Sequence, residues 1–333
     1  MVAAMDAPAA APVITARSNP HPGLGFREFV ALVAGLMALN ALSVDVMLPG
    51  LAAIDAALGV ADDNDRQLVL GVYLGGFAAA QLVWGPLADR FGRKPALMVG
   101  LGLYVVASVG AALAPSFGAL LAARLAQGLT AASTRVIALA LVRDCYAGRG
   151  MGRVMSLVMM VFMIVPILAP GIGQVILLVA PWRWMFGLLL AGGVAMLLWV
   201  VLRLPETLRP RHRRRLRLAP LLAAYGEIVT NRVTCGYMLA LGVIFGALFG
   251  FLTSAQQVMQ EVFGLGLWFT VAFAGIAGLM SAASFTNARL VTDLGMRKLG
   301  HGALVGFTAL AAAQYAVAAA GVENFAIFFV LQS

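Results

Sequence analysis

Apolar segments close to the length of a membrane crossing recur along the whole chain, and they constrain its fold more than any other feature. About 20 apolar residues are needed for a helix to cross the hydrocarbon of a bilayer. Hydrophobic residues make up 62% of the chain and charged residues 11%, and its mean hydropathy is +0.94. A soluble domain has too little polar surface for this composition. We therefore predict a membrane protein.

The segments lack the period-two alternation of barrel strands, and backbone groups in lipid must be paired within their own segment. We therefore predict an all-α polytopic fold with ten helical segments, at 28–50, 67–86, 95–114, 117–142, 154–180, 184–204, 233–254, 267–288, 299–320 and 323–333.

The two ends of the chain differ from the apolar interior. Residues 1–25 are rich in Ala and Pro without a long apolar core, so we interpret them as a tail and not as a signal peptide. The last segment supplies only about ten apolar residues, enough to reach halfway across a bilayer. We expect about 9.5 transmembrane helices in a C-terminally truncated chain, divided into a tail (1–25), a six-helix bundle (26–205), a basic linker (206–231) and an incomplete second bundle (232–333).

Basic residues predict the orientation. Of the 23 Lys and Arg residues, 19 fall in the tail or in loops after even-numbered segments, which the positive-inside rule assigns to the cytoplasm. The segment 209–218 alone holds six arginines, and we expect this linker to contact anionic headgroups. The net charge of +9 therefore reflects topology and gives no support for nucleic-acid binding.

No residue pattern indicates catalysis or a metal. The cysteines, Cys145 and Cys235, lack metal-ligand spacing, and the histidines (His21, His212, His301) are scattered. There is no nucleophile–base set and no phosphate-binding glycine loop. We predict a protein that is not an enzyme and that has no cofactor or metal.

The loop after the second segment reads GPLADRFGRK (85–94). Six of its positions match the pattern G-x-L-a-D-R-x-G-R-K, namely Gly85, Asp89, Arg90, Gly92, Arg93 and Lys94. The pattern resembles the loop signature of the major facilitator superfamily, which lies between the second and third helices. The alternative is a loop that is basic only for topology. The resemblance implies two six-helix bundles around a central cavity.

The resemblance also gives this loop a conformational role. Gly85 would let helices touch closely, and Asp89 would pair with Arg143 at the end of the fourth helix. In the family the aspartate also faces the positive N-terminus of an eleventh helix, which we do not expect here. A weak repeat supports two related halves, because shifting residues 288–299 by 203 positions aligns Gly295 with Gly92.

Further motifs resemble the proton-driven drug-efflux branch of the superfamily. They are DVMLPG (45–50), RLAQG (124–128), VRD (142–144) and PILAPGIGQ (166–174). Within that branch the chain is most similar to the bicyclomycin/chloramphenicol-resistance group. Arg135 departs from the pattern of this group, whose helix-interior arginine stands at the position of Leu139, so the substrate stays open. In the fifth helix, Pro166, Pro170, Gly171 and Gly173 allow a bend and close helix contact, or a purely structural kink.

Asp45 and Arg124 are the candidates for proton coupling. An ionisable side chain within a membrane helix costs a few kcal/mol on insertion scales and usually faces a wet cavity or a partner. We predict that the two residues lie at the same depth, and the resemblance implies that their helices line the cavity. A nearby arginine favours an ionised carboxylate, whereas burial favours the neutral acid. Alternatively, Asp45 is a helix-end residue bonded to Ser43 or to backbone.

Gln127, Arg135 and Asn40 are the cavity candidates. Arg135 follows Arg124 by 11 residues, so both share a helix face about 16 Å apart. Arg135 would line the cytoplasmic half of the cavity or extend to the inner headgroups.

The expected function is proton-coupled efflux of small lipophilic drugs across the bacterial inner membrane by alternating access. The expected protein is a monomer with a cytoplasmic N-terminus, and its partners are the drug, protons and membrane lipids. The alternatives are a metabolite/proton symporter of the same fold and a truncated fragment that does not transport.

Overall fold

The computed structural model describes residues 24–59, 62, 64–208, 210, 213, 218–294, 296–321 and 324–332. Every regular element in these ranges is a helix, which confirms the all-α prediction. Residues 1–23, most of the predicted tail, lie outside the described residues. Eight of the described helical segments are long and apolar enough to cross a membrane, and another helix carries a shorter apolar stretch, Phe269–Ala283. The protein is therefore a multi-pass membrane protein.

The helices match the predicted segments with few exceptions. Their bounds are α1 Phe26–Asp45, α2 Leu51–Leu58, α3 Leu68–Phe91, α4 Arg93–Ala112, α5 Phe117–Cys145, α6 Gly148–Val179, α7 Arg183–Arg203, α8 Leu218–Thr230, α9 Arg232–Gln257, α10 Phe269–Leu294, α11 Met296–Ala319 and α12 Phe325–Gln332. Short 3₁₀ turns occur at Leu48–Gly50 (η1), Asp65–Gln67 (η2) and Gly266–Trp268 (η5), and a π-helical turn (η4) at Val258–Val262.

The first crossing is longer than the predicted segment 28–50. Helix α1 ends at Asp45, and the chain continues through η1 into α2, so that one apolar span covers Phe26–Leu58. Pro49 lies in this break, where it has no backbone N–H to donate to the carbonyl oxygen of Asp45 four residues earlier. Asp45 therefore lies at the end of α1 and well inside the span.

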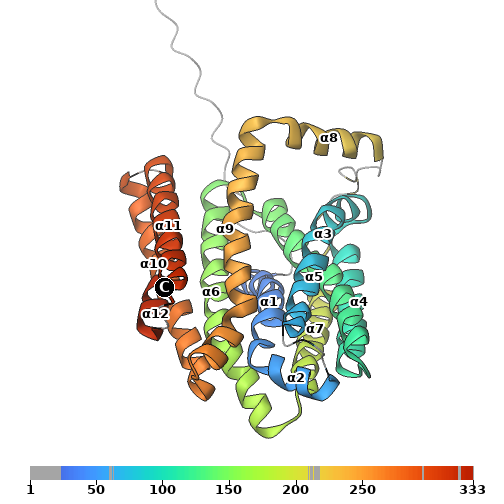
Figure 1. Cartoon of the computed structure of the whole chain (residues 1–333). Coiled ribbons are helices and arrows are strands. Elements are labelled where there is room, and N and C mark those ends of the chain that lie inside the picture. The colour runs from blue at the N-terminus through green and yellow to red at the C-terminus, as the bar shows by residue number, and fades with distance from the viewer. Residues whose placement is uncertain are drawn as a thin grey trace, which may run out of the picture.

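We divide the helices by their order along the chain into α1–α7 and α9–α12, and call these the first and second groups. In the first group α3 packs along α5, α4 packs against α5 and α7, and α1 contacts α5, α6 and α7. Nearly all fully buried apolar side chains belong to this group. Helix α10 packs against α6, and Figure 1 shows α11 and α12 next to α10 on the same side of the molecule.

The second group is packed less closely. The membrane-crossing parts of α9 and α11 contain no buried residue in their most apolar stretches. A Cβ atom added at Gly242, Gly246 or Gly278 would meet nothing within 4 Å, and only Gly275 has a near neighbour, Phe329. Within the described residues, the first group is thus compact and the second is packed more loosely.

One end of the molecule carries the loops that follow even-numbered crossings, and we call it the linker end. Helix α8 runs across this end in Figure 1, and the Tyr225 hydroxyl donates to the carbonyl oxygen of Leu82 at 2.7 Å. Most of the arginine-rich segment 209–218 lies outside the described residues, as does Gly295 of the repeat. The headgroup contact of the linker thus stays a prediction.

Candidate functional site

Arg124 lies at the centre of a buried polar network in the first group. Its side chain has no exposed surface. The guanidinium donates from Nε to the carbonyl oxygen of Val69 at 3.0 Å and from Nη2 to that of Ser43 at 3.1 Å. Nη1 donates to Oε1 of Gln127 at 2.5 Å. One side chain on α5 thereby joins α1 and α3.

The network continues to α4. Gln127 donates from Nε2 to the Ser108 hydroxyl at 2.8 Å, and that hydroxyl donates to the carbonyl oxygen of Tyr104. The Tyr104 hydroxyl lies 2.7 Å from the Ser43 hydroxyl, which donates to the carbonyl oxygen of Leu39. Within this network the buried side chains of Ser43, Tyr104, Ser108, Arg124 and Gln127 each have a hydrogen-bond partner.

Aromatic rings complete the surroundings of Arg124. The guanidinium carbon lies 4.3 Å from the ring centroid of Tyr73 on α3 and 5.9 Å from that of Phe186 on α7. Among the described residues, no carboxylate forms an ion pair with this arginine. The charge is held by carbonyl dipoles and ring faces, a combination that suits the weakly hydrated guanidinium.

Asp45 is buried close to this network without joining it. Its exposed fraction is 3%, and no hydrogen bond or ion pair to its carboxylate is found within the described part of the chain. The contact between Arg124 and Ser43, two residues before Asp45, agrees with the predicted common depth. The alternative bond from Asp45 to Ser43 is not formed, because Ser43 is engaged by Leu39 and Tyr104.

The three cavity candidates have different surroundings. Gln127 is fully buried, and both ends of its amide are bonded within the network, so it is not available to a ligand in this conformation. Asn40 is half-buried, and its Nδ2 has no partner among the described residues. Arg135 is also half-buried. Of the three, Asn40 has the clearest unmet hydrogen-bonding capacity.

The Pro- and Gly-rich motif at residues 166–174 of α6 produces one close contact between helices. Helix α6 stays continuous through Pro166 and Pro170. A Cβ atom at Gly173 would lie 2.3 Å from the carbonyl oxygen of Val46, next to Asp45, whereas one at Gly171 would make only ordinary contact with Thr270 at 3.6 Å. Helix α6 can therefore approach the end of α1 this closely only because Gly173 has no side chain.

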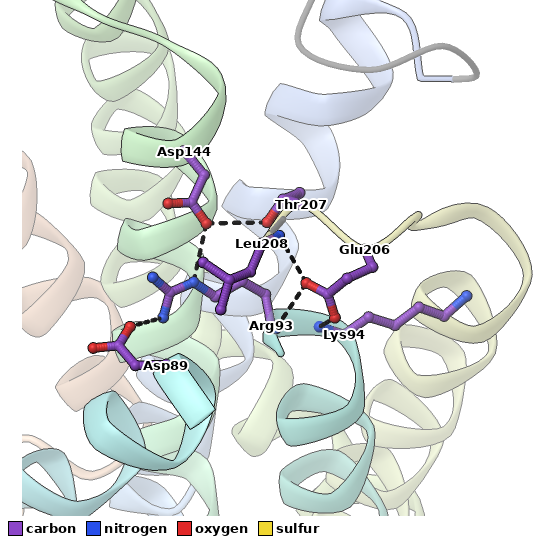
Figure 2. Close-up of polar contacts among 7 residues, drawn as sticks. All are labelled: Asp89, Arg93, Lys94, Asp144, Glu206, Thr207 and Leu208. Atoms are coloured by element: carbon purple, nitrogen blue, oxygen red, sulfur yellow. Dashed lines mark hydrogen bonds and ion pairs between the residues drawn. The ribbon is translucent and has the colours of Figure 1, made fainter. Parts of the chain in front are cut away.

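A second polar cluster lies at the linker end (Figure 2). Arg93 donates from Nη1 to Asp89 at 2.6 Å and from Nε to Asp144 at 3.0 Å, and Asp144 also accepts from the Thr207 hydroxyl at 3.1 Å. The predicted pair between Asp89 and Arg143 is wrong for this conformation. Neighbouring helix residues point about 100° apart, so Asp144 faces Arg93 while Arg143 is exposed.

The linker itself contributes to this cluster. Glu206 accepts at Oε1 from the backbone amides of Arg93 and Leu208, both at 2.9 Å, and at Oε2 from that of Lys94 at 3.2 Å (Figure 2). The first amides of a helix lack partners within the helix and carry its positive dipole end. A carboxylate from the linker thereby caps α4.

The other members of the loop motif differ in how strongly the structure constrains them. Gly92 has a φ of +107°, which only glycine adopts readily. Arg90 is exposed and lies over the ring of Phe91, and Lys94 donates from Nζ to the carbonyl oxygen of Val201 at 2.9 Å. The close contact predicted at Gly85 is wrong, because a Cβ atom there would lie 3.9 Å from Val136, its nearest neighbour.

Comparisons with known proteins agree with this architecture. The sequence profile of the Major Facilitator Superfamily matches residues 33–332. An uncharacterised MFS-type transporter, YdgK of Bacillus subtilis, is 33% identical over 256 residues, which cover 76% of this chain and 63% of that protein. A bicyclomycin resistance protein homolog of Haemophilus influenzae is 31% identical over 268 residues, covering 80% and 67%.

A third relative and two solved structures extend these matches. The multidrug resistance protein MdtL of Escherichia coli is 32% identical over 266 residues, covering 78% of this chain and 66% of that protein. The chain thus spans about two thirds of the length of these relatives. A crystal structure of a D-xylose–proton symporter aligns with a TM-score of 0.60 at 16% identity, covering 91% and 77%. The human organic anion transporter MFSD10 aligns at 0.54 and 20%, covering 75% and 70%.

Proposed function

Since this chain belongs to the major facilitator superfamily, whose members are carriers and not enzymes and need no cofactor, we propose that it takes part in proton-coupled efflux of small lipophilic molecules. The substrate class rests on the similarity to relatives named for bicyclomycin and multidrug resistance. The linker end is cytoplasmic in this proposal, the membrane is the bacterial inner membrane, and the protein acts as a monomer among its lipids.

The observation that carries the proposal is the buried carboxylate of Asp45 without a polar partner. Ionising a carboxylate away from water and from hydrogen-bond donors costs free energy. Asp45 would therefore hold its proton while enclosed by α1, α5 and α6, and release it when a conformational change admits water. That dependence on exposure is the property required for exchanging a proton against a substrate.

Arg124 has a positioning role in this mechanism. Its three hydrogen bonds hold α1, α3 and α5 in one arrangement, and the close approach of Gly173 to Val46 ties α6 to α1. The helices around Asp45 therefore move as a unit. Alternating access would then change the water exposure of Asp45 through movement of the second group relative to the first.

The proposal is tested in membrane vesicles by measuring proton release on addition of a lipophilic cation such as ethidium. Asp45→Asn should abolish substrate-induced proton release while the protein stays in the membrane at normal abundance. Asp62→Asn, which changes an exposed loop aspartate, should leave proton release unchanged. Proton release that persists in Asp45→Asn would overturn the assignment of Asp45.

A further inference from the structure

Arg66 occupies an unusual position at the end of the molecule opposite the linker. It belongs to the η2 turn between the first two crossings, yet only 4% of its surface is exposed. Its Nη2 donates to Glu261, and its Nη1 lies 3.8 Å from Oδ2 of Asp55. Nε of Arg66 is buried and has no partner among the described residues. Arg66 therefore lies between two carboxylates, and its Nε–H is able to donate a further hydrogen bond.

The two carboxylates come from different groups of helices. Asp55 is on α2, in the same group as Arg66, whereas Glu261 is in the π-helical turn η4 that follows α9. The Asp55 side chain is 16% exposed and that of Glu261 is 44% exposed. The bond to Glu261 therefore crosses between the two groups, while the contact with Asp55 stays within the first.

A second pair of side chains crosses at the same place. Gln67 donates from Nε2 to Oε1 of Gln257, and Gln257 donates from Nε2 to Oδ1 of Asn64 at 3.3 Å. Gln257 and Glu261 are four residues apart and so face the same side of their helical turn. These polar contacts join residues in and next to η2 to the end of α9 and to η4. The bonded residues are 190 to 195 positions apart in sequence.

Buried apolar residues surround this crossing. Ala255 and Met259, on either side of Gln257, are 1% and 0% exposed, although most of α9 is exposed. The 3₁₀ turn η1 of the first group also contacts α9. At this end the second group therefore contacts the first through polar side chains that lie next to buried apolar residues. The Arg66 side of the ion pair is buried, so the pair is less screened than one between two exposed side chains.

We propose that Arg66 closes a gate between the two groups at this end, and that it exchanges Glu261 for Asp55 when the gate opens. This inference rests on the alternating access of the proposed function. A buried arginine that lost its only carboxylate would be strongly destabilised. With Asp55 already 3.8 Å away and Nε unoccupied, Arg66 keeps a carboxylate partner in both states. The guanidinium fork suits such a change of partner.

The gate is tested with the full chain in membranes by cross-linking across it. Cys145 and Cys235 are replaced by Ala, and the Gln67→Cys/Gln257→Cys pair is treated with a short bifunctional thiol reagent. Glu261→Gln should lower the cross-linking rate by about fivefold, because the closed state loses its ion pair. Asp55→Asn should leave the rate unchanged or raise it, because in the closed state Arg66 keeps its bond to Glu261 and loses only the longer contact with Asp55, whereas the open state loses its main carboxylate partner.

The two substitutions therefore have different expected effects on the cross-linking rate, which a merely structural role of Arg66 would not produce. Equal loss of cross-linking in Asp55→Asn and Glu261→Gln, or no loss in Glu261→Gln, would overturn the gate. The exchanged pair Arg66→Glu/Glu261→Arg should recover cross-linking relative to Arg66→Glu alone, and failure to recover it would also count against the proposal.

A matched control and an independent readout keep this test separate from the proposed function. Arg183→Gln changes another basic side chain at the same end, which bonds the carbonyl of Ala114 within the first group, and should leave cross-linking unchanged. Cross-linking reports conformation even without transport. Loss of proton coupling with the expected cross-linking pattern would refute drug efflux and keep the gate, whereas normal efflux without that pattern would refute the gate alone.

Discussion

Oε1 of Glu206 lies 2.9 Å from the backbone nitrogen of Arg93, so the start of the linker is bonded to the first turn of α4. The same residue, Arg93, uses its side chain to join Asp89 at the end of α3 to Asp144 at the end of α5. The loop motif, the end of α5 and the linker thus form one connected cluster (Figure 2). Any separation of the linker from the first group must break the bonds to Glu206.

We predict that Glu206→Ala destabilises the protein by about 1–2 kcal/mol, because the first amides of α4 lose their cap. The effect is measured as a fall in the thermal unfolding midpoint of the purified protein in detergent. Glu227→Ala, which removes an exposed carboxylate from α8, is the control and should leave the midpoint unchanged. Equal midpoints for both variants would show that Glu206 does not stabilise α4.

Gly92→Ala should destabilise the protein by at least about 2 kcal/mol, because the backbone at φ +107° is strained for any L side chain. The new Cβ atom would also lie 2.3 Å from Oε2 of Glu206. The same substitution at Gly102, a helical position with nothing within 4 Å, should be neutral or slightly stabilising. A comparison of the two unfolding midpoints checks the prediction, and similar midpoints would contradict it.

Much of the fold was predictable because long apolar runs encode membrane helices. In addition, the loop motif that includes Arg93 and Lys94 is typical of one loop in one fold. Partners were harder to predict. The resemblance assigned Asp89 to Arg143 because both charges lie at the same end. Which of the neighbouring residues Arg143 and Asp144 faces the loop motif depends on a helix rotation of about 100° that sequence spacing leaves open. In the structure Asp144 faces the motif, and Arg93 pairs with both Asp89 and Asp144.

The missed site residues are of two kinds. Tyr104 and Ser108 were missed, and Ser43 was considered only as a partner of Asp45, because single hydroxyl groups are common in apolar helices and need no special partner. Their spacing on facing helices becomes meaningful only once Arg124 and Gln127 are packed between them. Glu206 lies in a loop, where a carboxylate is unremarkable until the helix terminus next to it is known.

Arg124→Lys should abolish transport and lower stability by about 2–4 kcal/mol, because an ammonium group cannot reproduce three hydrogen bonds from a planar fork that also stacks on Tyr73. The measurements are substrate efflux in cells and the unfolding midpoint in detergent. Arg143→Lys, on the same helix but exposed, should change neither quantity. Loss of efflux in Arg143→Lys would instead support the pairing of Arg143 with Asp89 that the resemblance implies.

Gly173→Ala should impair the contact between α6 and α1, because its Cβ atom would lie 2.3 Å from the carbonyl oxygen of Val46 and 2.9 Å from Cγ of Pro49. Overpacking of this kind costs about 1–3 kcal/mol, and here the displaced backbone lies next to Asp45. We therefore expect a lower unfolding midpoint together with weaker proton coupling. Gly171→Ala, which meets only Thr270 at 3.6 Å, is the matched control on the same helix. If the two variants couple equally well, the close approach at Gly173 does not position Asp45.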